Sequence, residues 1–294
     1  MALASTIWGL SGLFYKQIAH VPALEVLSHR TLWALILFLI LIIVQGRLGE
    51  WRALVLNWRA LPLIAFAAVM ISVNWFFFIY SVQVGHAVEA SLGYYIFPLV
   101  AVLLGQILFK ERLSRWQWIA VGFAALAVTV LTLGLRIVPI ISLVLATTFG
   151  LYGASKKKIA AGPVLSVSVE VLLLAPLALI WLWGVHTQGW TGIVGRTGGY
   201  FGTGWFETLM LIAAGPMTAV PLILFSYASR RVSYATVGLV QYLNPTFQAI
   251  VAVFVFAEPF THWHIIAFAL IWSGLAIYSA DSIQRERSLK VRQG

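Results

Sequence analysis

The chain has 294 residues, of which 61% are hydrophobic and only 10% are charged, and it carries a formal net charge of +10 and no cysteine. This composition excludes an ordinary soluble globular protein, because a surface in contact with water needs far more charged side chains. The absence of cysteine excludes disulfides, thiol chemistry and thiolate metal sites. Apolar runs of about twenty residues recur along the chain, and each can cross a bilayer core of roughly 30 Å as a helix. The composition therefore predicts a polytopic helical membrane protein.

The apolar runs follow one another along the chain with short connections, none of them long enough for an inserted soluble domain. We expect membrane-spanning helices at residues 2–19, 23–44, 60–82, 87–109, 115–135, 137–155, 164–184, 206–228, 234–257 and 262–281. The longest connection, residues 186–205, is rich in glycine. It could act as a mobile lid, but its composition favours a flexible surface loop.

The basic residues indicate the direction in which the chain crosses the membrane. Ten spans place both termini on one side, where fifteen lysines and arginines fall, against three on the other side, while Arg30 lies within a span. Because connections rich in Lys and Arg stay in the cytoplasm, we expect both termini in the cytoplasm of a bacterial-type inner (plasma) membrane. Lys156–Lys158 is then a topology signal. The same rule explains the net charge, so nucleic acid is not an expected partner.

Residues 87–132 resemble residues 234–279 at a constant offset of 147 positions. The matched pairs include Tyr95 with Tyr242, Pro98 with Pro245, Phe109 with Phe256, Glu111 with Glu258, and Trp116 with Trp263. A unit of five spans has an odd number of crossings, so a second copy enters the membrane in the opposite orientation. The charges agree with this, since Lys110-Glu111-Arg112 on the expected inner side becomes Ala257-Glu258-Pro259 on the outer side.

The predicted fold is therefore an all-α polytopic membrane protein. Its ten transmembrane helices form two inverted-topology five-helix repeats. The first repeat is expected at residues 1–135, and the second at residues 136–294, where a short cytoplasmic tail ends the chain.

Seven motifs spread over the chain point to a known family. They are Ser28-His29-Arg30, Val73-Asn74-Trp75, Gly85-His86, Glu89–Tyr94, Gly215-Pro216, Gln241–Pro245 and Phe256–Phe260. With them, nearly the whole chain resembles the RarD-like permeases of the EamA branch of the drug/metabolite transporter (DMT) superfamily. In general plan it is also similar to the YddG-type amino-acid exporters. The resemblance implies ten helices in two inverted repeats and the export of small metabolites, but it does not fix the substrate.

Pro98 and Pro245 fall near the middle of the fourth and ninth predicted spans. A proline inside a helix removes a hydrogen bond and crowds the carbonyl four residues back, which kinks the helix. A carbonyl freed in this way within lipid needs a partner or a water-filled cavity. The two prolines are therefore candidate hinges of a central cavity, or kinks that only pack against other helices. The candidate substrate-binding residues around them are Ser91, Tyr94, Tyr95, Gln241, Tyr242 and Asn244, and two more, Trp75 and Tyr80, lie on the third predicted span, which is expected to face the same cavity.

Charged residues inside or beside the spans are further candidates. Arg30 and Glu170 are intramembrane charges, which serve either structural pairing or the handling of substrate or protons. Their depths differ by about 10 Å, which disfavours a direct salt bridge. Glu25 and His29 share a helix face and are expected to help hold Arg30.

Two further pairs of polar residues lie near the ends of spans. His86 and Glu89 open the fourth span and suit either a helix cap or an outer gate. Glu111 and Glu258 follow the fourth and ninth spans and are expected to anchor loops.

We conclude that the sequence predicts an inner-membrane secondary transporter or facilitator. It is expected to export amino acids or related small neutral or zwitterionic metabolites by alternating access. The alternative within transport is a broad drug-efflux permease, and outside transport an integral membrane enzyme, although the chain has neither a Walker loop nor an HExxH motif. The expected partners are a small-molecule substrate and the lipid bilayer. No cofactor or metal is expected, and the coupling ion and the oligomeric state are left open, a monomer being the simplest.

Overall fold

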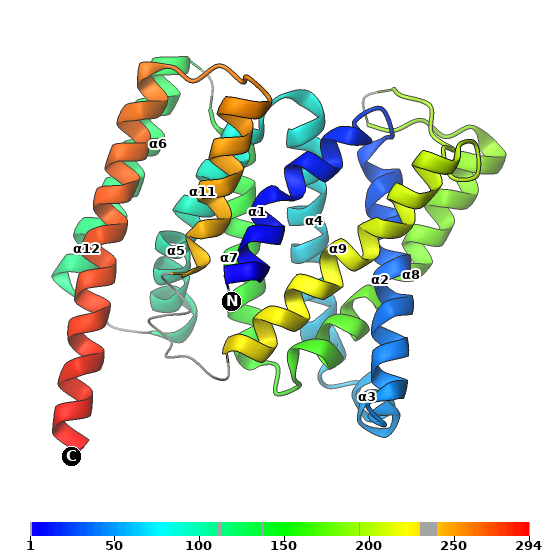
Figure 1. Cartoon of the computed structure of the whole chain (residues 1–294). Helices are drawn as coiled ribbons and strands as arrows, with labels where there is room; N and C mark the ends of the chain where they lie inside the picture. Colours follow the sequence, from blue (N-terminus) through cyan, green and yellow to red (C-terminus); the bar gives the residue numbers. More distant parts are fainter. Residues whose placement is uncertain (1, 111–112, 137, 194, 230–239, 294) are drawn as a thin grey trace.

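The structure, a computed structural model, describes residues 2–110, 113–136, 138–193, 195–229 and 240–293 (Figure 1). This part of the chain is almost entirely helical and contains no named β-strand. Seven of its helices are long and apolar enough to cross a membrane. They are α2 (Ala23–Val44), α4 (Leu61–Val84), α5 (Ala87–Phe109), α6 (Arg115–Leu135), α8 (Pro163–Gln188), α9 (Trp205–Ser229) and α12 (His262–Gln293). The prediction of an all-α membrane protein is confirmed.

Three further helical segments coincide with predicted spans but are shorter or more polar. They are α1 (Ala2–Gln17), α7 (Ile140–Lys158), and α11 (Leu243–Ile250), which continues into the π-helical η1 (Val251–Val255). The beginning of the ninth predicted span, residues 234–239, lies outside the described residues. The short α3 (Leu48–Val55) was not predicted, and it lies at the same end of the molecule as the C-terminus (Figure 1).

Local signals in the sequence explain where the long helices begin and end. A capping box starts α6, because Ser114 Oγ accepts from the Gln117 N–H (3.0 Å) and Gln117 Oε1 accepts from the Ser114 N–H (2.9 Å). Gly85 ends α4 in the left-handed conformation, with φ of 78°, which a glycine adopts without strain. Pro163 stands in the first turn of α8, where its missing N–H costs no helical hydrogen bond. The bounds of α2, α5 and α6 equal the predicted ones, whereas α4 ends at Val84 and α8 at Gln188, beyond the predicted ends at 82 and 184.

The helices pack against partners that are distant in sequence. α6 lies along α12, α2 packs against α8 and α9, and α5 lies against α7 and α11 (Figure 1). Glycines permit the closest approaches: a Cβ on Gly93 would lie 2.7 Å from the Ser142 carbonyl oxygen, and one on Gly9 would lie 2.7 Å from Phe247 Cβ. Such small residues are typical of helix contacts inside membranes, where they let backbones come together.

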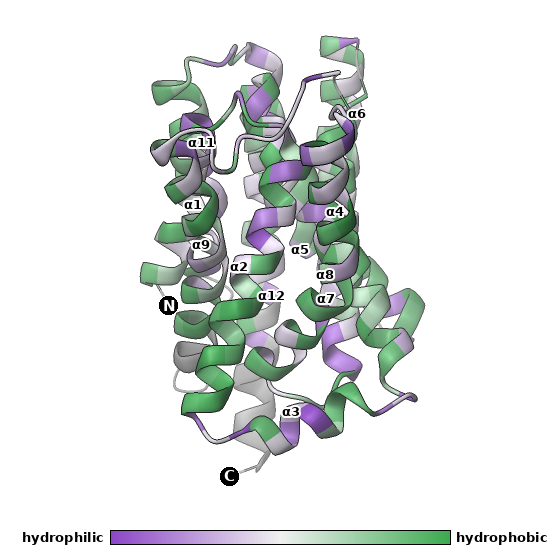
Figure 2. Ribbon diagram, turned by 90° about the vertical axis from the view of Figure 1, so that its right-hand side faces the viewer, coloured by the Kyte–Doolittle hydropathy of each residue, from purple (hydrophilic) through white to green (hydrophobic). Residues whose placement is uncertain are grey.

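Apolar side chains cover the outside of the bundle as well as its interior. Tyr95, Phe38 and Leu92 are buried in the core, whereas Ile40 and Leu133 are exposed on the outer surface of α2 and α6. Figure 2 shows apolar residues along the helices and hydrophilic ones in α3 and in the connections. This distribution is expected of a bundle whose surface faces lipid.

Candidate functional site

Tyr95 lies at the point where α5 meets α11 and α12. It is 2% exposed, and its hydroxyl lies 2.7 Å from Oγ1 of Thr246 on α11. The ring packs against Phe268 and Trp272 of α12, with centroid distances of 5.5 and 5.6 Å. The two proline-containing segments singled out in the sequence are therefore neighbours, and Tyr95 is hydrogen-bonded between them.

The neighbouring Tyr94 faces α4 and α7. Its hydroxyl donates to Oδ1 of Asn74 on α4 (2.8 Å), and Asn74 Nδ2 donates to the Leu145 carbonyl (3.0 Å) and to Thr148 Oγ1 (3.1 Å) of α7. Asn74 is 1% exposed, so this network satisfies a buried amide inside the bundle. Asn74 was not predicted as a site residue, although an asparagine within an apolar run was a signal that could have found it.

The candidate residues of the ninth span lie at the start of α11. Tyr242 caps α11, and its carbonyl accepts from Thr246 Oγ1 (2.7 Å). Asn244 Oδ1 accepts from Gln248 Nε2 (2.9 Å), and Gln241, just before the cap, is half-buried. Gln241, Tyr242 and Asn244 are therefore partly exposed, whereas Gln248 is buried.

The remaining candidates are placed differently. Ser91 is fully buried and donates to the Val88 carbonyl of its own helix (2.7 Å), so its hydroxyl is used locally. Tyr80 stacks on Phe76 of the same helix α4, with ring centroids 5.8 Å apart. Trp75, on the same helix, faces the guanidinium of Arg30.

The two prolines have different surroundings. Pro98 stands inside α5, as predicted for a kink. Pro245 stands in the first turn of α11, because a turn at Tyr242 starts a new helix there. A proline in a first turn removes no intrahelical hydrogen bond. At Pro245 the structure thus has a helix start in place of the expected mid-helix position.

Arg30 is buried among α1, α2 and α4, with 5% of its surface exposed. Its Nη1 donates to the Tyr15 hydroxyl (2.8 Å), and its guanidinium carbon lies 4.1 Å from the centre of the Trp75 ring. Its Nε has no hydrogen-bond partner. In the described part of the chain, no carboxylate forms an ion pair with Arg30.

Glu25 and His29 do not hold Arg30, and that expectation was wrong. The Glu25 carboxylate accepts from the backbone N–H groups of Gly199 (2.9 Å) and Tyr200 (2.8 Å), and His29 stacks on Phe201, with centroids 4.6 Å apart. Five residues along a helix separate Glu25 from Arg30 by about 140° around its axis, so the two side chains face different neighbours. The glycine-rich connection is consequently anchored to α2 by its backbone.

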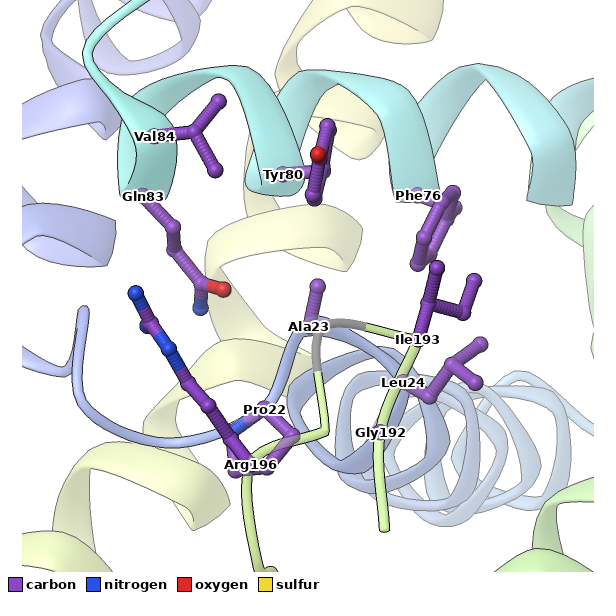
Figure 3. Close-up of a pocket in the computed structure, with 10 residues that line it drawn as sticks. All are labelled: Pro22, Ala23, Leu24, Phe76, Tyr80, Gln83, Val84, Gly192, Ile193 and Arg196. Carbon is purple, nitrogen blue, oxygen red and sulfur yellow. The ribbon is translucent and has the colours of Figure 1, made fainter.

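This anchored connection closes a small pocket at one end of α4 (Figure 3). The pocket has an empty volume of about 300 Å³, part of it open to solvent. Its lining residues are Pro22, Ala23, Leu24, Phe76, Tyr80, Gln83, Val84, Gly192, Ile193 and Arg196. Gln83 Nε2 donates to the Val21 carbonyl (2.8 Å), and Arg196 Nη1 donates to the Ala19 carbonyl (2.8 Å). Both polar groups therefore bind the turn between α1 and α2, and the pocket lies where this turn meets α4 and the glycine-rich connection.

Glu170 is fully buried in α8 and pairs with Lys156 of α7, whose Nζ lies 2.6 Å from Oε1. Lys156 also donates to Ser166, and the Tyr152 hydroxyl lies beside the carboxylate. Oε2 of Glu170 has no hydrogen-bond partner. Lys156, which was expected only as a topology signal, thus neutralises a buried charge. As the depth argument predicted, Glu170 does not bridge to Arg30.

The start of α5 carries two carboxylates. Glu258, from the connection between η1 and α12, accepts from the N–H groups of Ala87 and Val88 (2.8 Å each), which makes it an anchor as expected. His86 occupies the N-cap position without a side-chain hydrogen bond to the helix backbone, and its Nδ1 lies 2.6 Å from Glu89 Oε1. Negative charge at a helix N-terminus is stabilising, and the backbone contacts of a cap come from Glu258. Glu111 lies outside the described residues.

A bundle of apolar helices with neutral polar networks and a few paired charges in its interior is typical of membrane transporters. Residues 1–133 match the EamA-like transporter family. An uncharacterized transporter of Pseudomonas aeruginosa is 40% identical, over 97% of this chain and 94% of its own length. The protein RarD of Streptomyces exfoliatus is 39% identical, over 97% and 89% of the two chains.

A solved crystal structure that is 19% identical shares the fold, with a TM-score of 0.59 over 94% of both chains. The chain therefore belongs to the EamA-like transporter family, as a RarD-like permease of the drug/metabolite transporter superfamily, and it is a membrane transporter. Among the residues that the structure describes, no group of three or more His, Asp or Glu side chains is placed to hold a metal ion.

Proposed function

We propose that this transporter exports amino acids or related small neutral or zwitterionic metabolites across the inner membrane by alternating access. The observation that carries the proposal is the neutral, aromatic character of the interior where α5 meets α4, α7 and α11. Tyr94, Tyr95 and Asn74 supply hydroxyl and amide groups there, and the surrounding rings are apolar. A multiply charged solute in such surroundings would leave charge uncompensated at low dielectric, which is costly.

Alternating access is supported by the way in which the helices contact one another. If α1, α2, α4, α5 and α6 correspond to α7, α8, α9, α11 and α12, several of the most extensive helix contacts have counterparts. The contact between α5 and α7 corresponds to the contact between α11 and α1. In the same way, the contact between α4 and α7 corresponds to that between α9 and α1, and the contact between α2 and α9 corresponds to that between α8 and α4. Two inverted repeats with equivalent contacts can exchange conformations, and the exchange opens the opposite side.

The correspondence extends to single residues. A Cβ on Gly150 would lie 3.3 Å from Val100 Cγ1 of α5, and one on Gly9 would lie 2.7 Å from Phe247 Cβ of α11. Gly9 and Gly150 occupy matching places in the proposed repeats, and Val100 and Phe247 are related by the offset of 147 positions. Repeats at residues 1–135 and 136–294 account for both contacts.

Counterflow in proteoliposomes tests the function. Vesicles with purified protein, preloaded with unlabelled phenylalanine, should accumulate radiolabelled phenylalanine, methionine or threonine in preference to glutamate. Tyr95→Ala and Tyr242→Ala should reduce the exchange, by about fivefold if each hydroxyl contributes about 1 kcal/mol. Phe66→Ala, at a 43% exposed ring on the outer surface of α4, is the matched control and should exchange normally.

Three results would contradict this proposal. A preference for glutamate would mean that the pathway compensates the charge of a second carboxylate, and full exchange in both tyrosine variants would place the site elsewhere. Transport of a cationic dye such as ethidium without any amino-acid exchange would favour the alternative of broad drug efflux.

A further inference from the structure

Arg30 is a buried positive charge without a negative partner in the described part of the chain. Its guanidinium has five N–H donors, and one bond, to Tyr15, is recorded while Nε has none. The other buried charged side chains differ in this respect. Glu25 has two backbone donors, Glu258 has two, and Glu170 has Lys156.

Depth makes the isolated charge costly. Arg30 is the eighth residue of α2, roughly 10 Å along the helix from its first residue at 1.5 Å per residue. Insertion scales assign a cost of a few kcal/mol to an arginine within a membrane helix, and such residues face the bundle interior and mark pathways for solutes or ions. Two aromatic rings lower the cost in part, because Trp75 and Tyr15 present their faces to the guanidinium, 4.1 and 5.8 Å from its carbon.

We propose that Arg30 binds the carboxylate of the transported solute, so that the solute itself supplies the missing negative charge. The inference rests on the proposed function and names the recognition group of the same site. Arg30 already touches one candidate substrate residue, because its guanidinium lies over the Trp75 ring.

The geometry of the group suits this task. A guanidinium is planar and offers parallel N–H donors that match the two oxygens of a carboxylate, a pairing stronger than a neutral hydrogen bond. The Trp75 ring packs against one face of the guanidinium plane, and the Tyr15 hydroxyl accepts a hydrogen bond from only one of its nitrogens, Nη1. The unbonded Nε belongs to the edge of the guanidinium that a carboxylate takes in a bidentate contact.

The charge balance also defines the class of solute. One carboxylate neutralises Arg30, whereas a second carboxylate would stand unpaired beside the rings of Trp75 and Tyr15. The site therefore selects monocarboxylates with an apolar or aromatic body. An ammonium group on the solute can interact with the faces of aromatic rings, so zwitterions are accommodated.

Four small molecules that share a phenyl ring separate the contributions. Phenylalanine has both a carboxylate and an ammonium group, 3-phenylpropionate has only the carboxylate, phenylalaninamide only the ammonium, and 2-phenylethylamine lacks the carboxyl carbon altogether. Their affinities for the purified wild-type protein are measured from ligand-dependent shifts in the melting temperature. Phenylalanine and 3-phenylpropionate should bind at least about tenfold more tightly than the two molecules without a carboxylate.

Variants then assign the discrimination to Arg30. Arg30→Gln should abolish the difference in affinity between phenylalanine and phenylalaninamide. Arg30→Lys keeps the positive charge but loses the planar pair of N–H donors, so it should retain part of that difference. Arg47→Gln, at the exposed start of α3, is the matched control and should discriminate as the wild type does. If Arg30→Gln fails to fold, the affinities of the four ligands for the wild type and for Arg30→Lys still test whether Arg30 binds the carboxylate.

The outcomes separate this inference from the proposed function. Equal affinity for the acid and the amide, unchanged discrimination in Arg30→Gln, or no stabilisation by any of the four molecules would overturn the inference. Exchange of phenylalanine and phenylalaninamide at equal rates would overturn it while amino-acid export stands. Arg30-dependent binding of 3-phenylpropionate without exchange of phenylalanine would instead support the carboxylate site and refute amino-acid export.

Discussion

The carboxylate of Glu25 is fully buried, and the two N–H groups that it accepts belong to Gly199 and Tyr200, the first of them 174 positions away. A buried charge is tolerated only when its hydrogen bonds are made. This side chain of α2 therefore helps to position the connection between α8 and α9, together with the bond from Arg196 to the Ala19 carbonyl and the stacking of Phe201 on His29. The composition of this connection indicated flexibility, but these contacts restrain it.

Replacement of Glu25 by alanine should release the connection. We expect a loss of about 1–3 kcal/mol in stability, because two buried N–H groups lose their acceptor, and faster cleavage by trypsin at Arg196. Thermal melting and timed proteolysis in detergent measure the two effects. Glu50→Ala, which removes an exposed carboxylate paired with Arg47, should change neither. A wild-type cleavage rate in Glu25→Ala would show that other contacts hold the connection.

The pair of Lys156 and Glu170 makes a second prediction at this scale. Either single variant, Lys156→Gln or Glu170→Gln, should destabilise the protein by roughly 3 kcal/mol or less, because a buried charge then lacks its partner and Lys156 is partly exposed. The double variant should recover part of the loss, since neutral amides have no charge to desolvate. A double-mutant cycle built from melting temperatures measures the coupling between Lys156 and Glu170. Strictly additive losses in the double variant would contradict this coupling.

At the scale of helices, the close crossings depend on individual glycines. Gly93→Ala would bring a Cβ to 2.7 Å from the Ser142 carbonyl oxygen of α7, and such overpacking costs about 1–3 kcal/mol. Gly122, inside α6, has nothing within 4 Å of its Cβ position, so Gly122→Ala should leave the protein as stable or up to about 1 kcal/mol more stable. Thermal melting of both variants tests the contrast, and equal effects would contradict the crossing.

Helix ends were predictable wherever the chain carries its own signals, as at Ser114, Gly85 and Pro163. The start of α11 was not, because Pro245 suits both a kink and a first turn, and the turn at Tyr242 decides between them. The neutral aromatic character of the candidate site also followed from residue types. The contacts within the site could not be predicted. The hydrogen bonds of Tyr94 with Asn74 and of Tyr95 with Thr246 depend on the register between packed helices, and local propensity carries no information about that register.

At the scale of the whole molecule, the two ends of the bundle differ. α3, the connection from α7 to α8 and the C-terminus lie toward one end, and the connection from α8 to α9 lies toward the other (Figure 1). The first end includes Lys156–Lys158 and the arginines near α3. By the charge rule for membrane proteins, this end is predicted to face the cytoplasm.

Cysteine labelling tests this orientation, and the absence of native cysteine makes the experiment clean. Thr197→Cys, in the connection after α8, and Leu56→Cys, next to α3, both replace exposed side chains. An impermeant thiol reagent should label Thr197→Cys in intact cells and Leu56→Cys only after permeabilisation. The reverse result would invert the topology. Gly198 is less suitable for labelling, because a side chain there would meet Glu25.

The two hydrogen bonds from Glu258 to the first turn of α5 have a mechanical consequence. They hold that end of α5 against the chain just before α12, so bending at Pro98, the predicted hinge, would move the opposite end of the helix. The arm from Pro98 to Phe109 is about 16 Å long at 1.5 Å per residue. A change of about 20° at the proline, the size of an ordinary kink, would displace its tip by roughly 6 Å, enough to uncover a passage on the predicted cytoplasmic side while the clamped end stays closed.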